Sequence, residues 1–202
     1  MSLPITVVVP HQTSRLSFFG QVSMPQIIRN QVAELIVLPG SQGPAAKRNA
    51  GAKIATSDYL FFCDDDVVLR GGCLQMMLQA LEGNPGAAFA YADFDHVVYP
   101  GVQFVQKSGR VTAGPWDAGR LRKENYVSSM SLIRRAAFPG FDESLKALLA
   151  WDLWLTIAAK GGAGIYIPEV LFESHHPDLG MTMMVPIEES LKKIREKHGL
   201  SA

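Results

Sequence analysis

The chain has 202 residues, of which 48% are hydrophobic and 19% are charged. This length and composition indicate a globular chain with a sizeable core, and they exclude wholesale disorder. Nineteen basic and 19 acidic residues cancel to a formal net charge of zero. The chain therefore lacks the excess of positive charge that nucleic-acid-binding domains carry, and we expect no nucleic-acid partner.

Targeting signals and cysteine motifs are absent from the sequence. Residues 1–12 contain no basic segment followed by a long apolar core, and no later stretch stays apolar long enough to cross a bilayer. We therefore expect a cytoplasmic protein without a transmembrane segment, while a peripheral position at a membrane stays open. Cys63 and Cys73 lack the spacing of redox or zinc motifs, so we expect two reduced, buried thiols. Nothing in the residues indicates an oligomeric state.

The first part of the chain alternates apolar runs with helical patterns. Residues 5–9 and 34–38 are short runs that end at proline or glycine, as buried parallel strands do. The segment between them has only a weak helical pattern. Pro44 is well placed to open a helix over 45–56, and the apolar residues 59–63 predict a third strand.

The same alternation continues after the third strand. Apolar residues recur at helical spacing from Leu74 to Leu81, and residues 87–94 predict another strand. Alternating strands and helices predict an α/β fold, with a mostly parallel central sheet and helices on both faces. In such sheets ligands bind beyond the carboxyl ends of the strands.

The second part of the chain is less regular. From about 95 to 125 glycine, proline and polar residues predict a hairpin followed by a mobile loop. A helix is predicted over 141–162, and short strands over 163–168 and 170–174. The predicted helix has one apolar face: Leu145, Leu148, Leu149, Leu153 and Ile157.

The last predicted element is an amphipathic helix over 186–200. Its inward residues are expected to be Ile187, Leu191 and Ile194. The apolar stripe is narrow, so its basic face is interpreted as solvated surface and not as a membrane anchor.

Three consecutive carboxylates, Asp64, Asp65 and Asp66, directly follow the third predicted strand. Adjacent acids raise one another's pKa values when they are partly desolvated, unless a cation or several donors compensate them. Mg²⁺ and Mn²⁺ take oxygen ligands, and Mg²⁺ is usually held by one or two carboxylates together with phosphates. The triplet therefore indicates either a metal site or a solvated acidic turn.

Four segments together resemble family 2 glycosyltransferases, from about Ile5 to about His176. They are "ITVVVP", "KRNAGAKIATSDYLFFCDDD", "RRAAFPGFDESL" and "WDLWLTIAAKGG", in the family's order and at roughly its spacing. The resemblance implies the GT-A fold, which is nucleotide-diphospho-sugar transferase-like, in a single domain over 1–202. The implied parts are a nucleotide-binding half over about 5–95, an acceptor-side half over about 96–176, and a C-terminal helix over about 186–198.

The resemblance also implies an activity. Members of this family move a sugar from a nucleotide-diphosphate donor to the hydroxyl of a saccharide or other acceptor, so the chain resembles a metal-dependent, inverting hexosyltransferase. In the family an acid motif holds Mn²⁺ or Mg²⁺ on the donor's diphosphate. On that pattern Asp66 is the metal ligand, and Asp64 and Asp65 lie nearer to the nucleoside. His175 and His176 are candidates for a third ligand.

Other residues are assigned to the nucleotide by the same resemblance. They are Pro10, at the end of the first predicted strand, and Arg48 and Asn49, on the helix before the acid triplet. A surface ion pair is the alternative for Arg48.

The sequence departs from the family pattern at two places. Leu38 and Pro39 stand where acids commonly hold the base or ribose, and neither side chain accepts a hydrogen bond. Leu149 and Ala150 stand where the family has a Glu-Asp pair that contains the general base. Asp152 is the nearest acid and our candidate catalytic residue, although two helical residues turn it by roughly 200°.

Further acids are alternatives for the base, and other functions stay open. Asp93 and Asp95 follow the fourth predicted strand, close to where an acceptor would lie, and Asp117 lies in the expected loop. If no base is present, the chain would be a catalytically impaired nucleotide- or sugar-binding protein, or an interaction domain on the same scaffold. A nucleotidyltransferase fits poorly, because the first strand is not followed by a glycine-rich basic loop.

Overall fold

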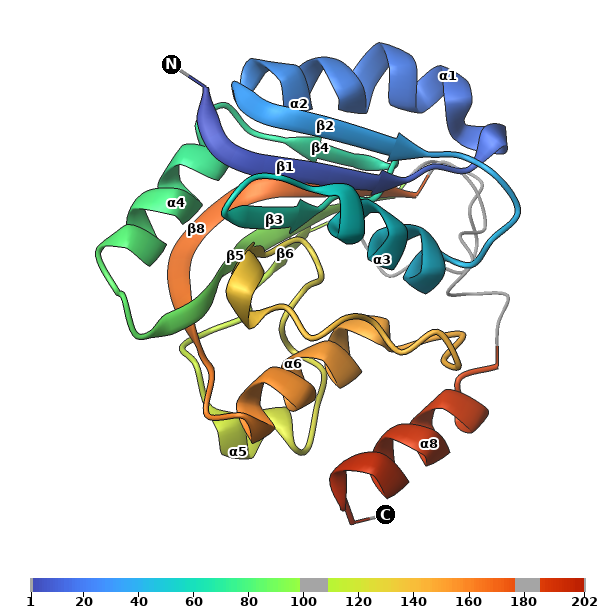
Figure 1. Ribbon diagram of the computed structural model, residues 1–202, viewed down its shortest axis with the longest axis vertical. Coiled ribbons are helices and arrows are strands. Elements are labelled where there is room, and N and C mark those ends of the chain that lie inside the picture. Colours follow the sequence, from blue (N-terminus) through green and yellow to red (C-terminus); the bar gives the residue numbers. More distant parts are fainter. Residues whose placement is uncertain (1, 99–108, 177–185, 202) are drawn as a thin grey trace.

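Strand β1 (Leu3–Pro10) pairs in parallel with β2 (Val32–Leu38) on one side and with β3 (Tyr59–Phe62) on the other (Figure 1). These three strands lie at one end of a curled sheet, which has eight strands among the described residues. The computed structural model describes residues 2–98, 109–176 and 186–201. The other strands are β4 (Val67–Leu69), β5 (Ala87–Val98), β6 (Gly109–Val111), β7 (Leu132–Arg134) and β8 (Ala163–His176).

The sheet combines parallel and antiparallel pairings. Its order is β2, β1, β3, β7, β5, β8, β4, and β6 pairs with β5 outside that path. Strands β5 and β8 are parallel, whereas β7 runs antiparallel between β3 and β5, and β4 antiparallel to β8. The predicted α/β fold with a central sheet is confirmed, and the antiparallel pairings are an addition that the alternating pattern did not indicate.

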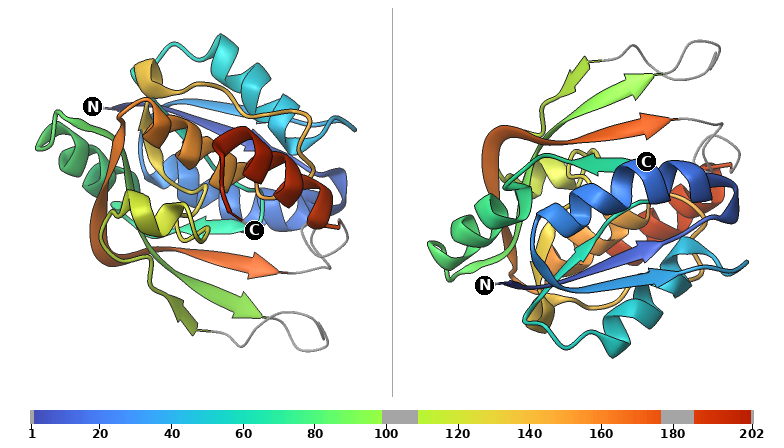
Figure 2. Two further views of the ribbon diagram at one scale, coloured as in Figure 1. Left: turned by 90° about the horizontal axis from the view of Figure 1, so that it is seen from below. Right: turned by 90° about the horizontal axis from the view of Figure 1, so that it is seen from above.

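Helices cover both faces of the sheet (Figures 1 and 2). They are α1 (Leu16–Phe18), α2 (Met24–Arg29), α3 (Pro44–Ile54), α4 (Cys73–Glu82), α5 (Ala118–Leu121), α6 (Leu149–Ala159) and α8 (Glu188–His198). A π-helical turn, Phe19–Ser23, joins α1 to α2. None of the described helices is long and apolar enough to cross a membrane.

Each central strand contributes side chains to two separate cores. Val7 and Phe61 pack in the core under α2 and α4, whereas Val8 and Phe62 pack in the core under α3 and α6. Successive side chains of a strand point to opposite faces, so a strand covered on both sides is apolar throughout. This explains the unbroken apolar runs. Cys63 and Cys73 are free and buried, as predicted.

The helix predicted over 141–162 is wrong in its extent. Helix α6 begins only at Leu149, because Leu148 has a φ of 58° and cannot continue a right-handed helix. Leu145 is nevertheless buried, since the preceding segment packs against the same core. In the residues before α6, the helical spacing of apolar residues therefore reflects burial of their side chains and not a helical backbone.

Two other expectations differ from the structure. The two strands expected over 163–168 and 170–174 are one strand, β8, whose register against β5 shifts around Pro168 and Glu169. A proline lacks the backbone N–H that a regular ladder needs. In α8, Ile194 is fully buried, but Ile187 is 43% exposed, so its predicted inward position is wrong.

The stretch predicted to be irregular over 95–125 contains two regular elements, β6 and α5. Strand β6 pairs antiparallel with β5, which confirms the predicted hairpin. The predicted mobile loop falls partly on 99–108, outside the described residues. Helix α5 follows, and its start is capped by Asp117, whose carboxylate accepts the amides of Gly119 and Arg120.

Gly51 allows α3 to pack closely on β1. A Cβ atom placed on this residue would lie 2.3 Å from Val8 Cγ1, a buried side chain of β1. Any side chain at this position would therefore collide with the strand. The glycine of the Arg-Asn-x-Gly segment thus has a packing role, and it fixes the distance of Arg48 and Asn49 from the sheet.

Glu34 on β2 connects that strand to the turn before β3, and we predict that it makes the stability of the protein dependent on acid pH. Hydrogen bonds from Thr56 and Thr6 lower its pKa from 4.5 to about 2. A carboxylate with a lowered folded-state pKa stabilises the fold above its unfolded pKa, and that stabilisation is lost as the pH falls.

The measurement is denaturant unfolding of wild type and Glu34→Gln from neutral pH down to pH 2. We expect the wild type to be more stable at neutral pH, and the difference to shrink between pH 4.5 and about 2. A difference that stays constant over this window would contradict the prediction.

Candidate active site

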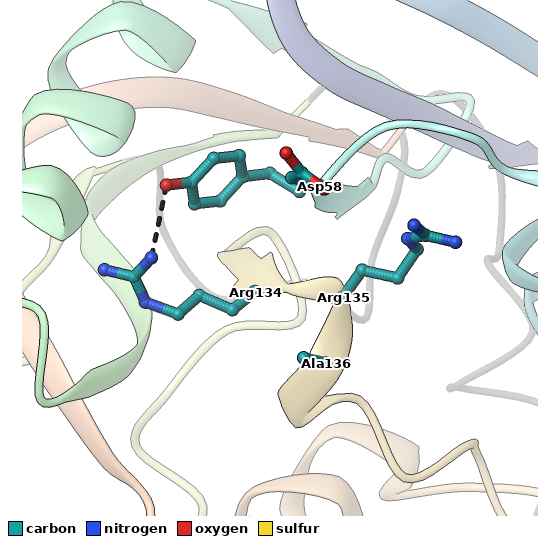
Figure 3. A pocket seen from close by; sticks show the side chains of 5 residues that line it. Asp58, Arg134, Arg135 and Ala136 are labelled. Carbon is teal, nitrogen blue, oxygen red and sulfur yellow. Dashed lines mark hydrogen bonds between the residues drawn. The ribbon is translucent and has the colours of Figure 1, made fainter.

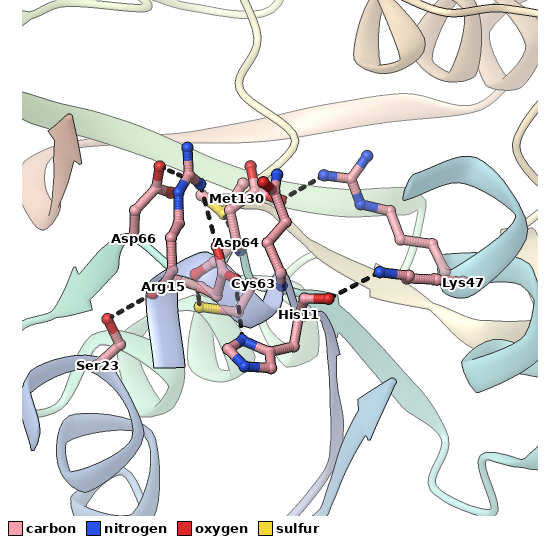
Figure 4. Close-up of polar contacts among 11 residues, drawn as sticks. His11, Arg15, Ser23, Lys47, Cys63, Asp64, Asp66 and Met130 are labelled. Atoms are coloured by element: carbon pink, nitrogen blue, oxygen red, sulfur yellow. Dashed lines mark hydrogen bonds and ion pairs between the residues drawn. The ribbon is translucent and has the colours of Figure 1, made fainter. Parts of the chain in front are cut away.

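The acid triplet lies where β3 ends and before β4 begins, at the carboxyl end of the parallel strands β1 and β3 (Figure 4). Each of its three carboxylates has a cationic partner within the protein. Arg48 of α3 pairs with Asp64, and Arg15 pairs with both Asp65 and Asp66. The repulsion between the acids is thus offset by two guanidinium groups.

Asp65 is the most buried member of the triplet, with 1% of its surface exposed. Its carboxylate lies 3.0 Å from His11 Nδ1 and accepts hydrogen bonds from the backbone amide of Gln12 at 2.6 Å and from Arg15 Nη1 at 3.1 Å. These partners all belong to the segment that follows β1. Asp65 therefore fastens that segment to the end of β3, and its predicted contact with the nucleotide stays a prediction.

Asp66 is also buried, and its carboxylate lies 2.6 Å from Arg15 Nη1. Burial and the charge of Asp64 raise the pKa of Asp66 to about 7, while Arg15 acts in the opposite direction. The backbone carbonyl of Asp66 accepts the amide of His175 at 2.9 Å. This bond holds the end of β8 beside the acid that we predict to bind metal.

Asp64 is the most accessible acid of the three, with 34% of its side chain exposed, and it lies 2.5 Å from Arg48 Nη2. Arg48 is buried, and its guanidinium lies 5.2 Å from the centre of the Phe141 ring. The Nε atom of Arg48 is buried and has no hydrogen-bond partner among the residues that the structure describes. Arg48 is therefore an internal ion pair and not the surface pair that was its alternative.

Asn49 joins α3 to the "GFDE" segment. Its side-chain amide donates to the carbonyl of Phe141 at 2.9 Å and to Glu143 at 2.8 Å, and its oxygen accepts the amide of Phe141 at 2.8 Å. The two most specific parts of the family resemblance are thus hydrogen-bonded to each other. Contact of Asn49 with a nucleotide stays a prediction.

The end of β1 is fixed by backbone contacts. Pro10 is buried and lies beside Leu38 of β2 in the sheet register. The amide of His11 donates to the Leu38 carbonyl at 3.0 Å, and Lys47 Nζ donates to the His11 carbonyl at 2.7 Å. The predicted nucleotide residues Pro10, Arg48 and Asp64 are therefore brought to one end of the sheet.

The histidine candidates lie at the end of β8. His175 Nε2 is 3.1 Å from a carboxylate oxygen of Glu173, and its ring packs near Phe18. The side chain of His176 lies outside the described residues. Among the described residues no three His, Cys, Asp or Glu side chains are grouped closely enough to hold a metal ion.

The acid triplet nevertheless offers a position for a cation, because the guanidinium of Arg15 already lies there. Arg15 Nη1 contacts two carboxylate oxygens, one from Asp65 and one from Asp66, so these oxygens face a position suited to positive charge. An ion held by Asp66 would need further oxygen ligands, and the phosphates of a nucleotide supply them.

Asp152, the candidate base, lies on α6 and is 2% exposed. Its carboxylate oxygens lie 2.8 Å from Lys197 Nζ and 2.8 Å from His198 Nε2, both on α8. The lysine also contacts Asp142. Asp152 therefore ties α8 to α6 and has a structural role. Its role as base stays a prediction.

We predict that Asp152→Ala lowers the free energy of unfolding by about 1–3 kcal/mol, since it leaves the buried His198 without its hydrogen-bond partner. Asp142→Ala is the matched control. Asp142 also contacts Lys197, but it is more exposed, so its loss should cost at most about 1 kcal/mol. Urea unfolding followed by tryptophan fluorescence measures both. Equal stability of wild type and Asp152→Ala would contradict the anchoring role.

The acceptor-side candidates differ in accessibility. Asp93 is fully buried and accepts hydrogen bonds from Arg110, Tyr166 and the amide of Ala113. Asp95, two residues along β5, retains 30% exposure of its side chain and pairs with Arg70. Of the four acids considered for the base, Asp95 combines partial exposure with a position on the strand beside β8, near Glu173.

Sequence reasoning missed two residues of this site, His11 and Arg15. Both lie in the segment with only a weak helical pattern, and their contacts with Asp65 span 54 and 50 residues. The one available signal was their position directly after a strand that ends at the same edge of the sheet as the triplet.

A hollow lies at the other end of β3, away from the acid triplet (Figure 3). It has a volume of about 500 Å³ and is lined by Asp58, Tyr59, Arg134, Arg135 and Ala136. The Arg134 guanidinium donates to the Tyr59 hydroxyl and to the carbonyls of Ala87 and Leu81. Arg134 therefore serves the fold, and the acid triplet remains the candidate active site.

The fold and this site together define the class of protein. The structure of S. aureus TarS 1-349 in complex with UDP-GlcNAc aligns with a TM-score of 0.71 at 14% identity, covering 98% of this chain and 65% of that one. The corresponding structure in complex with UDP aligns with a TM-score of 0.63, covering 87% and 61%. The chain has the GT-A fold, as predicted.

The sequence comparisons place the chain within that class. The profile of glycosyl transferase family 2 matches residues 23–139, more than half of the chain, and the chain belongs to this family. The uncharacterized glycosyltransferase YwdF of Bacillus subtilis (strain 168) is 29% identical over 185 residues, covering 82% of this chain and 64% of that protein. The pre-mycofactocin glycosyltransferase of Mycobacterium tuberculosis (strain ATCC 25618 / H37Rv) is 28% identical over 152 residues, covering 71% and 32%. The chain thus spans from about a third to less than two thirds of these relatives.

Proposed function

We propose that this protein is a metal-dependent inverting glycosyltransferase that uses a nucleotide-diphosphate sugar. The observation that carries the proposal is the acid triplet at the carboxyl end of β3, in a chain of family 2. The complexes of TarS with UDP and UDP-GlcNAc support a uridine nucleotide as the first candidate for the donor. The acceptor is a saccharide or another molecule with a free hydroxyl.

In this proposal Asp66 holds Mn²⁺ or Mg²⁺, and Asp64 with Arg48 lies toward the nucleoside. Bound metal offsets the charge that develops on the diphosphate as the sugar leaves, without a proton transfer. Arg48 holds Asp64 in place, and Asn49 keeps α3 and the "GFDE" segment together around the same end of the sheet. Leu38 and Pro39 provide no side-chain acceptor for a base or ribose.

An inverting transfer also needs a base within hydrogen-bond reach of the acceptor hydroxyl. We propose Asp95 for this role ahead of Asp152, Asp93 and Asp117. Asp95 is partly exposed and has one arginine partner, whereas Asp152 and Asp93 are buried with several partners, and Asp117 caps α5. Asp95→Asn should then lower turnover while nucleotide binding is kept. Unchanged turnover in that variant would exclude Asp95.

Thermal unfolding with UDP, GDP and CMP, each with and without Mn²⁺, tests the function. A ligand that binds only the folded state raises the unfolding midpoint. We expect one nucleotide to raise it, and only when Mn²⁺ is present. No shift with any combination would contradict the proposal and favour an interaction domain on a transferase scaffold. A shift without turnover of any sugar donor would favour the impaired binding protein, which the replaced Glu-Asp pair also suggests.

A further inference from the structure

Arg15 occupies an unusual position for an arginine. It is 7% exposed, and a single nitrogen, Nη1, lies 3.1 Å from Asp65 Oδ1 and 2.6 Å from Asp66 Oδ2 (Figure 4). Asp66 is the acid that we propose as the metal ligand. The oxygen that faces Arg15 is thus an oxygen that a metal ion would need.

We infer that Arg15 is a resident counter-cation of the acid triplet, which a divalent ion must displace from Asp66 in order to bind. This inference rests on the proposed function. Without a cation the three buried or partly buried carboxylates would repel one another. Arg15 offsets this repulsion in the free protein. It therefore competes with a metal ion for the Asp66 carboxylate.

The geometry allows a metal ion to displace Arg15 from Asp66 without leaving the Arg15 guanidinium unpaired. The same nitrogen of Arg15 also contacts Asp65, and Asp65 is held in turn by His11 and the amide of Gln12. Arg15 can therefore leave Asp66 and keep Asp65 as its partner. In this inference the metal-free and metal-bound states differ by a small movement of the Arg15 side chain.

The charge balance explains why nucleotide and metal would bind together. With Asp66 ionised, three carboxylates and the guanidinium groups of Arg15 and Arg48 leave one net negative charge in the cluster. A divalent ion that binds alone makes the net charge of the cluster positive. A diphosphate that binds together with the ion makes the net charge negative again. The presence of Arg15 should therefore weaken binding of the metal alone and couple metal binding to nucleotide binding.

The test measures Mn²⁺ binding directly, by the electron paramagnetic resonance signal of free Mn²⁺, for wild type, Arg15→Gln and Arg122→Gln. Arg122 is exposed and donates to the carbonyls of His198 and Gly199, so its variant controls for the loss of one positive charge. Without nucleotide we expect Arg15→Gln to bind Mn²⁺ about tenfold more tightly than wild type. Arg122→Gln should bind like wild type. An unchanged or weaker affinity in Arg15→Gln would overturn the inference.

Two further variants locate the effect. The gain should disappear in Arg15→Gln combined with Asp66→Asn, and a gain that persists there would mean that Mn²⁺ binds elsewhere and would overturn the inference. If circular dichroism shows that Arg15→Gln does not fold, Arg15→Lys decides instead. Its ammonium keeps the charge but is more strongly hydrated than a guanidinium, so it should hold the buried Asp66 less tightly, and a several-fold tighter binding of Mn²⁺ is expected. The same affinity as wild type would count against the inference.

The same titration, repeated with UDP, GDP or CMP present, separates this inference from the proposed function. Wild type that binds no Mn²⁺ even with nucleotide contradicts the proposed function. Wild type that binds Mn²⁺ with nucleotide, while Arg15→Gln shows no gain without it, contradicts only the role of Arg15.

Discussion

Asp66→Asn is expected to abolish the stabilisation by nucleotide with Mn²⁺ and to lower turnover about 10²- to 10³-fold. The amide keeps the shape of the side chain but carries no charge for a cation. Loss of several kcal/mol of charge stabilisation in the transition state corresponds to that fall in rate. The measurements are the thermal shift with UDP and Mn²⁺, and the rate of sugar transfer or donor hydrolysis.

The fold of Asp66→Asn should be intact, which makes the result interpretable. Arg15 keeps Asp65 as a partner, and removal of one charge relieves the repulsion from Asp64. The unfolding midpoint without ligands should therefore stay close to that of wild type. Asp58→Asn, an exposed acid at the other end of β3, is the matched control and should retain both the shift and the activity. Normal Mn²⁺-dependent binding in Asp66→Asn would rule out this acid as the ligand.

Asp65→Ala should instead act on stability and lower the free energy of unfolding by about 3–5 kcal/mol. Removal of a buried acceptor leaves its donors desolvated and without the bonds that compensated them. Here the substitution removes the acceptor of His11 Nδ1 and of the Gln12 amide, and it takes away one of the carboxylates that contact Arg15, which keeps Asp66. For a chain of this size such a loss corresponds to a fall of on the order of 10 °C in the unfolding midpoint.

Urea unfolding followed by tryptophan fluorescence checks this prediction. Asp58→Ala serves as the control, because an exposed acid outside such a cluster should change stability by no more than about 0.5 kcal/mol. If Asp65→Ala were as stable as wild type and failed only in nucleotide binding, Asp65 would not be needed to hold the segment after β1 against β3. Its predicted role at the nucleoside would then be favoured.

Together the two variants separate acids that are adjacent in sequence. Asp65 accepts hydrogen bonds from three donors of the segment after β1, whereas Asp66 contacts Arg15, which we infer competes with a metal ion for this carboxylate. The pKa of Asp66, raised to about 7 chiefly by burial, adds a pH dependence. Metal binding needs the deprotonated carboxylate, so it should weaken as the pH falls below 7.

Local patterns in the sequence were sufficient for much of the fold. The apolar run at 59–63 and the acids after it predicted a buried strand that ends in a charged cluster, because burial on both faces requires apolar side chains at every position. Pro44 and the small residues after it predicted α3. The start of α6 was not predictable from the same kind of pattern, because the apolar Leu148 packs partly buried against the core although its backbone is not helical.

The sequence by itself determined the α/β class, the family resemblance and the position of the acid triplet at a strand end, because these depend on the order and spacing of residues along the chain. Only the tertiary structure decided which groups neutralise those acids and which acids remain accessible. The partners of the Asp65 carboxylate lie 50 or more residues away, and Asp152 faces α8. Such contacts depend on how separate elements pack, and no local pattern encodes them.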